Sequence, residues 1–326
     1  MLKVGLIGCG FMGAMHASCY KNIEGVELCA VADIREDKAQ QIAGGSDIAI
    51  YSDGMDLIKN ACVDIIDICL PTFLHAKYAM AAIEKVKYVF VEKPVALTLE
   101  EAEAMKTKSI ETGANVQVGQ VIRFWDEYVE LKKIIESGKW GRVINANFRR
   151  ISPRPNWGWK DWLLDASLSG GAGQDLHVHD IDYVLSLFGE PLKFYSVKNT
   201  LGETNSYVNT LMEYKDFVVT VEGTWDLPTN YPFGASFRVV FERATVENCG
   251  GKFLLYTENG VEDIKLEKKE LAGTTAGGNI SDLGGYYNEL LYFTDRAKAG
   301  EPITRATLPD AAESLRFVLS ELNYKG

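Results

Sequence analysis

Apolar positions recur along the first part of the chain in short, nearly continuous runs, and a helical pattern follows each run. Such runs, rich in Val and Ile, suit parallel strands, because those strands are buried on both faces. Their alternation with helices predicts repeated β-α units in a doubly wound sheet. The predicted strands are Leu2–Ile7, Val26–Ala32, Val63–Cys69, Tyr88–Val91 and Asn115–Val118, and the predicted helices are Met12–Lys21, Glu36–Ala43, Met55–Ala61, Leu74–Lys85 and Leu99–Glu111.

The pattern changes after Gln120. A helix is predicted over Asp126–Ser137, and the alternation of Arg142–Ile151 indicates a half-exposed strand. Residues Ser152–Gly173 are rich in Pro, Trp, Gly and Ser, which predicts a long loop over a site. A short helix is expected next, over about Asp175–Phe188.

Several strand-like segments separated by turn residues follow from Lys193 to Glu267, which predicts an open, mainly antiparallel sheet. Helices near Gly285–Ala299 and Pro309–Asn323 would complete the fold. The expected class is α/β, with an N-terminal Rossmann doubly wound parallel sheet and a C-terminal α/β domain. Because an open sheet exposes one face, we also expect a homodimer or homotetramer.

Length and charge narrow the possibilities. At 326 residues the chain exceeds what one core usually organises, and we place a domain boundary after residue 121. The net charge of -11 disfavours a nucleic-acid partner. The apolar run Val4–Ile7 is far too short for a signal peptide or membrane span, so we expect a cytoplasmic protein with no membrane partner. Six cysteines lie singly and are interpreted as reduced core residues.

A glycine motif marks the end of the first strand. The strand runs directly into a G-x-G-x-x-G pattern, and a helix begins at once, which is the context that dinucleotide binding requires. Glycines permit the tight turn, the approach of backbone to the pyrophosphate and the packing of helix on strand, while the helix N-terminus faces the phosphates. The motif consists of Gly8, Cys9, Gly10, Phe11, Met12 and Gly13.

An acidic residue, Asp33, ends the second strand twenty positions after Gly13. A carboxylate there can accept hydrogen bonds from the ribose hydroxyls and repels a 2′-phosphate, which favours NAD over NADP. Arg35 could accommodate that phosphate, so NADP stays possible. The alternative is a structural turn followed by a surface aspartate.

Further motifs appear in order along the chain. They are Glu92, Lys93 and Pro94 after the fifth strand, then Gly170, Gly171, Asp175, His179 and Asp182, with the stretches Pro71–His75, Val118–Phe124 and Gly138–Val143. With them the sequence resembles the glucose-fructose oxidoreductase and inositol dehydrogenase family (Gfo/Idh/MocA) over essentially its whole length. It departs from the family pattern at His177, where the family often has glycine, and at Gln120, where the family often has an aromatic or other residue.

The resemblance implies an NAD(P)-binding Rossmann domain over 1–121 and a substrate-binding and oligomerisation domain over 122–326. It further implies hydride transfer between a nicotinamide and a sugar or cyclitol, and a cis peptide between Lys93 and Pro94. Expected catalytic residues are Lys93, Asp175 and His179, and expected substrate contacts are Lys93, Arg123, Trp162, Asp175 and His179. Expected cofactor contacts are Gly8, Gly10, Phe11, Met12, Gly13, Asp33, Arg35, Pro71, Thr72, His75, Glu92, Lys93 and Gln120.

The residue types suit this chemistry. Oxidation of a secondary alcohol needs a base at the hydroxyl beside the nicotinamide, and Lys93 follows a parallel strand at the edge where ligands collect. An exposed lysine paired with Glu92 is the structural alternative. Asp175 and His179 are four positions apart and share one face of a helix, although His179 could equally be a satisfied core histidine.

Other features stay open. His75 could line the pocket or cap its helix, and Trp162 could face a sugar ring or pack on its own domain. Because H-x-H can chelate zinc, crowding of Asp175, His177, His179, Asp180 and Asp182 suggests a metal-dependent hydrolase, but His177 and His179 point apart on a helix and a further ligand set elsewhere is missing, so we expect no metal. The remaining alternative to an enzyme is a sensor that binds NAD(H) without turnover, which would not need Lys93, Asp175 and His179 together.

Overall fold

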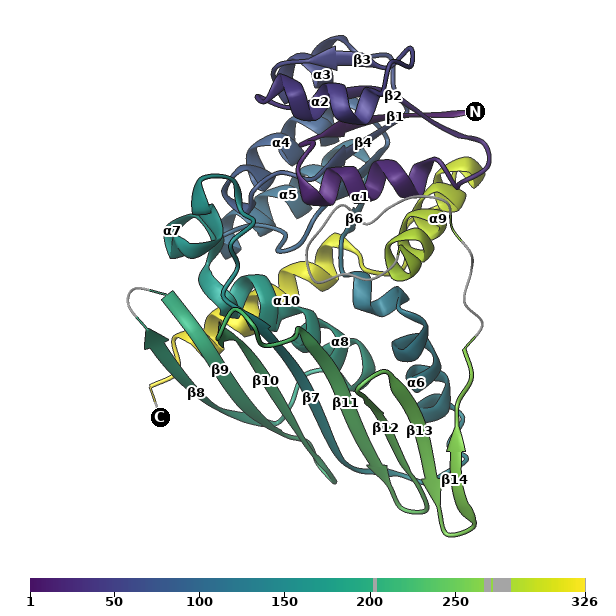
Figure 1. Ribbon diagram of the computed structural model, residues 1–326, viewed down its shortest axis with the longest axis vertical. Coiled ribbons are helices and arrows are strands. Elements are labelled where there is room, and N and C mark those ends of the chain that lie inside the picture. Colours follow the sequence, from purple (N-terminus) through teal and green to yellow (C-terminus); the bar gives the residue numbers. More distant parts are fainter. Residues whose placement is uncertain (202–203, 267–270, 272–282, 326) are drawn as a thin grey trace. The chain divides into compact units, whose positions relative to one another are not determined.

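The computed structural model describes residues 1–201, 204–266, 271 and 283–325, so Glu267, the last residue of the predicted strand region, lies outside the described residues. The chain forms two compact units, each built around one sheet (Figure 1). Unit 1 comprises Met1–Val121 with Lys269–Glu313, and unit 2 comprises Ile122–Lys268 with Ser314–Gly326.

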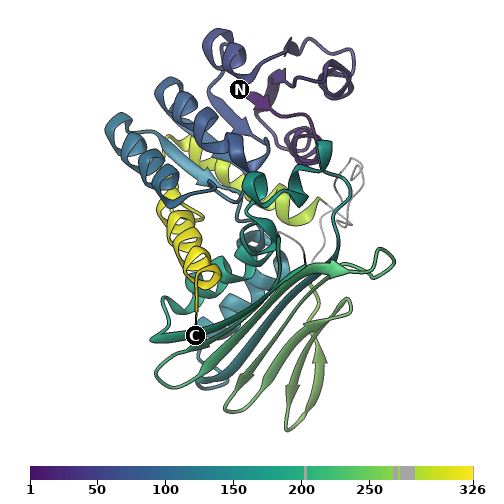
Figure 2. The same ribbon diagram turned by 90° about the vertical axis from the view of Figure 1, so that its left-hand side faces the viewer.

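Unit 1 contains a six-stranded parallel sheet in the order β3-β2-β1-β4-β5-β6, which confirms the doubly wound prediction. Helices lie on both faces of this sheet (Figure 2). Its strands are β1 (Leu2–Ile7), β2 (Val26–Ala32), β3 (Ala49–Tyr51), β4 (Ile65–Ile68), β5 (Tyr88–Val91) and β6 (Asn115–Val118). Its helices are α1 (Phe11–Tyr20), α2 (Glu36–Ala43), α3 (Gly54–Asn60), α4 (Thr72–Lys85), α5 (Leu99–Thr112) and α9 (Gly284–Ala299).

The burial of the central strands and the capping of the helix ends explain why these segments form strands and helices. Every residue of β4 and β5 is buried, as expected of central strands covered on both faces. Helix α5 begins with a capping box, in which Thr98 accepts a hydrogen bond from the Glu101 amide, and it ends at Gly113 with a φ of 71°. Strand β3 was not predicted, because three residues at a sheet edge carry too little pattern.

Unit 2 contains an eight-stranded sheet in the order β14-β13-β12-β11-β7-β10-β9-β8. All neighbours are antiparallel except β7 and β10, which confirms the predicted mainly antiparallel sheet. Its strands are β7 (Val143–Pro153), β8 (Lys193–Leu201), β9 (Thr204–Glu213), β10 (Val218–Leu227), β11 (Gly234–Phe241), β12 (Thr245–Cys249), β13 (Lys252–Thr257) and β14 (Gly260–Asp263).

The two faces of this sheet differ. On β7 the alternate residues Ala146, Phe148 and Arg150 are buried, and the Arg150 guanidinium binds Asp180 of a helix on that face. Helices α6 (Asp126–Glu136) and α8 (Val178–Phe188) cover this face (Figure 1). The strand register places the exposed apolar side chains of Tyr195, Val197 and Leu211, on neighbouring strands β8 and β9, on the other face, with Val261 on the same face at the opposite edge, on β14.

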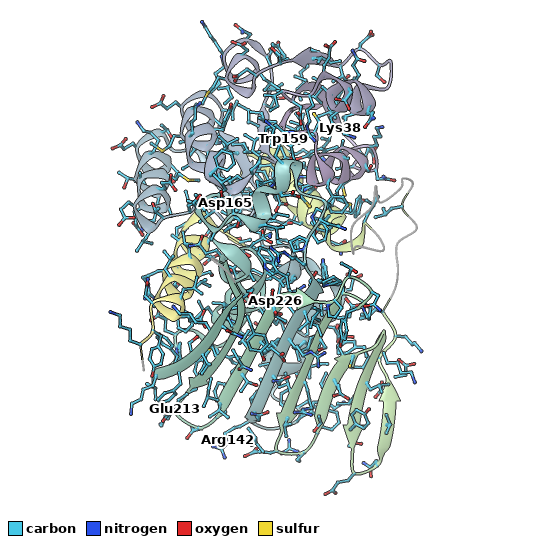
Figure 3. The ribbon with its side chains drawn as sticks, turned by 60° about the vertical axis from the view of Figure 1, so that its left-hand side comes forward. Lys38, Arg142, Trp159, Asp165, Glu213 and Asp226 are labelled. Carbon is cyan, nitrogen blue, oxygen red and sulfur yellow. The ribbon has the colours of Figure 1, made fainter. Side chains whose placement is uncertain are left out.

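The predicted loop over Ser152–Gly173 is only partly a loop. It contains a 3-10 helix, η2 (Trp159–Leu164), and a short helix, α7 (Ala166–Ser169). Figure 3 labels Trp159, the first residue of η2, and Asp165, the residue before α7. Asp165 caps α7 by accepting a hydrogen bond from the Ser167 amide at 2.9 Å. The prediction missed these turns because single helical turns show no hydrophobic periodicity.

The helix predicted over about Asp175–Phe188 begins differently. A π-helical turn, η3 (Gly173–His177), leads directly into α8. Helix α10 (Leu308–Leu322) is the last element.

Among the described residues, no helix has both the length and the apolar character needed to cross a membrane.

Candidate active site

The glycine motif forms a close turn between β1 and α1. Gly8 has a φ of 93°, and a Cβ at this position would lie 2.4 Å from the carbonyl oxygen of Cys69. A Cβ at Gly13 would lie 1.9 Å from the carbonyl oxygen of Gly8. At Gly10, in contrast, the nearest atom is Nη2 of Arg35 at 3.6 Å, so backbone at Gly10 is open to a close approach.

The N-terminus of α1 suits a pyrophosphate. The helix begins at Phe11, no side chain caps it, and its first turn carries no acidic residue. Its first N–H groups and the positive end of its dipole therefore stay available to an anion beside Gly10. Phe11 and Met12 are half-buried, and Gly13 packs the helix against the turn. These features fit the nucleotide that the motif predicts.

Asp33 lies at the end of β2 and is 9% exposed. Its carboxylate accepts hydrogen bonds from the amides of Cys9 and Arg35, both at 2.8 Å. The Arg35 guanidinium donates to both carboxylate oxygens at 3.1 Å. Burial and the Asp33 charge raise the pKa of Cys9 to about 12, so this cysteine is a neutral thiol beneath the glycine turn.

Two buried polar atoms follow other strands of the same sheet. Thr72, the first residue of α4, comes after Pro71, and Gln120 comes two residues after β6. Their atoms Oγ1 and Oε1 have no hydrogen-bond partner among the described residues, although both side chains are about 1% exposed. Buried polar atoms normally have partners, so these atoms also fit a bound nucleotide.

Strand β5 leads into Glu92 and Lys93. Glu92 is 4% exposed, and its Oε2 accepts a hydrogen bond from the Lys93 amide at 3.0 Å. A Cβ at Gly119 would come within 2.9 Å of the Glu92 carboxylate, so the glycine after β6 makes room for it. Lys93 is half-buried, and the Lys93–Pro94 peptide is cis, as the resemblance implies.

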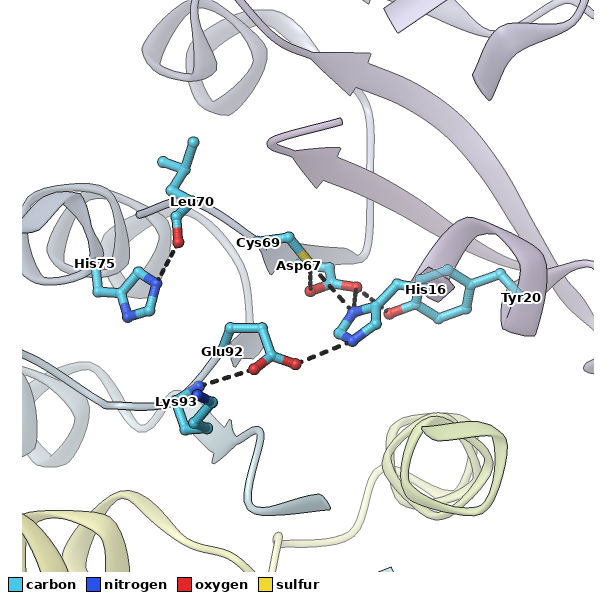
Figure 4. Close-up of polar contacts among 8 residues, drawn as sticks. All are labelled: His16, Tyr20, Asp67, Cys69, Leu70, His75, Glu92 and Lys93. Carbon is cyan, nitrogen blue, oxygen red and sulfur yellow. Dashed lines mark hydrogen bonds and ion pairs between the residues drawn. The ribbon is translucent and has the colours of Figure 1, made fainter. Parts of the chain in front are cut away.

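His16 of α1 lies under this segment, fully buried (Figure 4). Its Nδ1 lies 2.8 Å from Oδ2 of Asp67, to which the Tyr20 hydroxyl also donates at 2.8 Å, and its Nε2 lies 3.1 Å from Oε1 of Glu92. Burial alone would lower the pKa of His16, but the charge and hydrogen bond of Asp67 raise it well above its ordinary value. This shift favours the imidazolium form of His16.

The donor atoms of His16, Asp67 and Cys69 all lie within 4.8 Å of one another, and these residue types can bind metals. Here Oδ2 of Asp67 already binds Nδ1 of His16 and accepts from the Tyr20 hydroxyl, both at 2.8 Å, and the Cys69 thiol donates to Oδ1 at 3.5 Å. We therefore interpret the cluster as a hydrogen-bond network. The metal hypothesis concerned a different cluster, at 175–182.

His75 of α4 is 1% exposed, and its ring contacts Pro94, the residue that follows Lys93. Its Nδ1 faces the carbonyl oxygen of Pro94 and its Nε2 that of Leu70, both at 2.7 Å. Burial lowers the pKa of His75, which keeps the ring neutral, so only one of these nitrogens donates at a time. The residue links the segments that follow β4 and β5, and its contact with a cofactor stays a prediction.

In unit 2, one helix carries Asp175 and His179. Asp175 is half-buried in the π-helical turn, and His179 in α8 is 9% exposed. His177, between them, lies in the core, with Nε2 at 3.4 Å from Oε1 of the buried Glu321. A Cβ at Gly223 would lie 2.7 Å from His177 Nδ1, so a glycine on β10 provides the space for this imidazole.

The two other predicted substrate contacts differ in surroundings. The Arg123 guanidinium binds the fully buried Asp182 through two hydrogen bonds of 2.6 and 2.8 Å, and the Ser314 hydroxyl donates to the same carboxylate at 2.9 Å. Arg123 thus has a structural partner, and its substrate contact stays a prediction. Trp162 is half-buried in η2, and its contact is also a prediction.

Within unit 1 the structure brings the glycine turn to Asp33 and Arg35, and it places Thr72, Lys93 and Gln120 after strands of one parallel sheet. The carboxyl ends of parallel strands share one edge, where ligands of such sheets bind.

Sequence reasoning missed the role of His16 and Asp67. A charged residue inside the apolar strand Ile65–Ile68 was the signal, because a buried carboxylate needs a partner.

Comparison with protein families agrees with this geometry. Residues 2–120 match an oxidoreductase family with an NAD-binding Rossmann fold, and residues 128–247 match the GFO/IDH/MocA C-terminal domain. The chain belongs to the Gfo/Idh/MocA oxidoreductase family. This Gfo/Idh/MocA protein accordingly has an NAD-binding Rossmann domain at its N-terminus.

Individual relatives point the same way. An inositol 2-dehydrogenase 2 of Saccharopolyspora erythraea is 33% identical over 194 residues, 59% of this chain and 55% of that protein. The chain thus spans little more than half of that relative. The scyllo-inositol 2-dehydrogenase (NAD(+)) of Bacillus subtilis is 29% identical over 245 residues, 73% of this chain and 70% of that protein.

Solved structures share the fold. A levoglucosan dehydrogenase in complex with NADH and levoglucosan superposes with a TM-score of 0.85 at 22% identity, covering 99% of this chain and 96% of that one. An oxidoreductase from Agrobacterium radiobacter in complex with NAD+, L-tartaric acid and magnesium has a TM-score of 0.84 at 18% identity, covering 99% and 95%.

Proposed function

We propose that this protein is a dehydrogenase that transfers a hydride between NAD(H) and a secondary alcohol or ketone of a sugar, cyclitol or related compound. The observation that carries the proposal is in unit 1, where an open glycine turn and Lys93 belong to one parallel sheet. Ligands of such sheets collect at the carboxyl ends of the strands. The names of the relatives, inositol dehydrogenases among them, support the substrate class.

The proposed roles follow from the chemistry. When bound, the nicotinamide accepts or supplies the hydride. Lys93 takes the hydroxyl proton during oxidation and returns it during reduction. Asp175 and His179 bind and orient the substrate hydroxyls, and His179 shares the proton transfer. Arg123 and Trp162 complete the substrate contacts.

We also propose a preference for NAD over NADP. The Asp33 carboxylate repels a 2′-phosphate, while the bound Arg35 reduces that repulsion, so NADP is used less efficiently but measurably. The ratio of kcat/KM for the two coenzymes measures this preference. An Asp33→Ala variant should move the ratio toward NADP, and a ratio that does not move would contradict this role of Asp33.

The division of labour is a further part of the proposal. Residues 1–121 bind the nucleotide, while residues 122–326 bind substrate and associate into a homodimer or homotetramer. The exposed face of the eight-stranded sheet supports association, because it presents apolar side chains on several strands. Sedimentation equilibrium gives the oligomeric state, and a monomer at micromolar concentration would contradict this part.

The main test combines binding with turnover. Calorimetry measures NAD+ and NADH binding, and absorbance of the reduced nicotinamide follows oxidation of a panel of inositols, aldoses, sugar phosphates and anhydrosugars. Lys93→Ala should keep coenzyme binding and lower kcat by about 10²- to 10⁴-fold. The matched control is Lys59→Ala, which alters an exposed lysine of α3. Coenzyme binding without turnover of any compound would instead support the sensor hypothesis.

A further inference from the structure

The segment that carries Lys93 is held by a charge network that the proposed reaction does not itself require. Three side chains form a buried row, Asp67 on β4, His16 on α1 and Glu92 after β5, and each is at most 6% exposed (Figure 4). Three elements distant in sequence thus meet at one imidazole.

The row ends on the main chain of Lys93. Oε1 of Glu92 lies 3.1 Å from Nε2 of His16, as a charge contact without the alignment of a hydrogen bond, while Oε2 accepts the Lys93 amide at 3.0 Å. Gly119 leaves space for the same carboxylate, because any side chain there would come within 3.0 Å of it. The contacts that hold the Glu92 carboxylate are thus those to His16 and to the Lys93 amide.

The groups around His16 favour a doubly protonated ring. Asp67 and the neutral thiol of Cys69 face it from β4, the Tyr20 hydroxyl from its own helix, Glu92 from the segment after β5 and Glu289 from α9. Burial and the Glu92 charge raise the pKa of Glu289 well above its ordinary value, which favours the neutral carboxyl. Two carboxylates, Asp67 and Glu92, thus share one imidazolium.

We propose that His16 is a positioning residue, which holds the Glu92 carboxylate and through it fixes the main chain from which the Lys93 amine reaches the reacting hydroxyl. The inference rests on the proposed function, since it assigns the base role to Lys93. His16 contacts neither substrate nor coenzyme in this role. A shift of about 1 Å in a reacting group can cost about 100-fold in rate, so such positioning has a measurable effect.

Two substitutions separate the partners of His16. The amide nitrogen of glutamine reaches as far as the imidazole Nε2 and can still contact Glu92, whereas that of asparagine reaches only as far as Nδ1 and keeps Asp67 instead. We expect His16→Asn to lower kcat about ten-fold or more with little change in NADH binding. His16→Gln replaces the charge by an amide N–H that can donate to Oε1 of Glu92, so it should lose less of kcat than His16→Asn. Equal kcat in both variants, whether reduced or unchanged, would overturn the proposal.

Tyr20→Phe is the matched control, because Tyr20 contacts the same Asp67 oxygen but not Glu92. It should leave kcat unchanged, and a loss equal to that of His16→Asn would assign the effect to general stability and overturn the positioning role.

A spectroscopic arm does not depend on a known substrate. The chain has four histidines, so ¹⁵N-histidine spectra of the wild-type protein can resolve each ring. At pH 8 we expect one ring, absent from His16→Gln, to carry protons on both nitrogens. A neutral His16 ring at that pH would overturn the proposal.

The amine of Lys93 provides a second signal. After ¹³C reductive methylation, the resonance lost in Lys93→Arg reports the position of that amine. It should move in His16→Asn and stay in Tyr20→Phe, and an unmoved resonance in both overturns the positioning role. Failure of the wild type to bind coenzyme would instead contradict the proposed function.

Discussion

His16 and His75 are both buried in unit 1, and each has two polar partners, but the partners differ in charge. His16 lies between two carboxylates, at 2.8 and 3.1 Å, whereas His75 lies between two main-chain carbonyl oxygens, both at 2.7 Å. The pKa of His16 is raised and that of His75 is lowered. Burial of similar extent thus favours a cation in one place and a neutral ring in the other, because the carboxylate charge outweighs desolvation at His16 and the carbonyl hydrogen bonds do not outweigh it at His75.

The two rings also hold neighbouring residues of one segment. His16 contacts the Glu92 side chain, and His75 contacts the carbonyl of Pro94, so Lys93 lies between two fixed points along the chain. The comparison suggests a division of work, in which one contact depends on charge and the other on main-chain hydrogen bonding. The following experiments test that division.

The largest effect is expected from Asp67→Asn. This substitution keeps the shape of the side chain but removes the charge that compensates the His16 imidazolium, and breaking a buried ion pair costs about 3–5 kcal/mol. Urea unfolding measures the change in the free energy of unfolding. Asp64→Asn, an exposed carboxylate next to the same strand, is the control and should change it by less than about 0.5 kcal/mol. Similar losses in both variants would contradict a special role of Asp67.

His75→Leu should have the next largest effect. The leucine fills the space but leaves the carbonyl oxygens of Leu70 and Pro94 without the imidazole donor, at a cost of about 2 kcal/mol. Thermal and urea unfolding measure this loss. Because His75 is neutral, its loss should be the same at pH 7 and pH 9, and a loss that falls between those values would contradict the neutral ring.

Opposite pH dependence is the third expectation. The folded pKa of His16 is raised, so its stabilisation is complete below pH about 6.5 and is lost as the pH rises through the folded value, by about 1.4 kcal/mol per pH unit. The folded pKa of His75 is lowered, so its stabilisation is present above pH about 6.5 and is lost as the pH falls toward the folded value. Unfolding free energies of wild type, His16→Gln and His75→Leu from pH 5 to 9 separate the two. Parallel curves would contradict the comparison.

The smallest effect is expected from Tyr20→Phe. It removes one hydrogen bond to Asp67 and leaves both ion contacts of His16, at a cost of about 1 kcal/mol. The His16 ring should stay doubly protonated in ¹⁵N spectra at pH 8. A loss as large as that of Asp67→Asn would show that Tyr20, and not the charge of His16, is the main partner of the carboxylate.

Much of the fold could be predicted from the sequence, because strands such as β4 and β5 are buried on both faces and are apolar at nearly every position. Strand β3 could not, since its Ile50 is exposed at a sheet edge. The π-helical turn Gly173–His177 also could not, because a shift of hydrogen-bond partner leaves the hydrophobic pattern unchanged.

In the candidate site, too, some residues could be predicted from local spacing and others could not. The glycine turn and Asp33 are fixed by local spacing, so the sequence predicted them, and the structure brings them together. The contact of His16 with Glu92 joins residues that are 76 positions apart, and that of His177 with Glu321 joins residues 144 positions apart. Such contacts depend on tertiary packing, which no local pattern encodes.

The position of β7 has a consequence for synthesis of the protein. This strand of 11 residues is the first of its sheet along the chain, yet it lies inside the sheet between β10 and β11. During translation one of its edges therefore stays without its partner until the chain has been made to Leu227, and the other until it has been made to Phe241. Unpaired strand edges promote aggregation, and pairing of distant segments is slow. Nascent chains that stop within unit 2 should consequently be the most prone to aggregate.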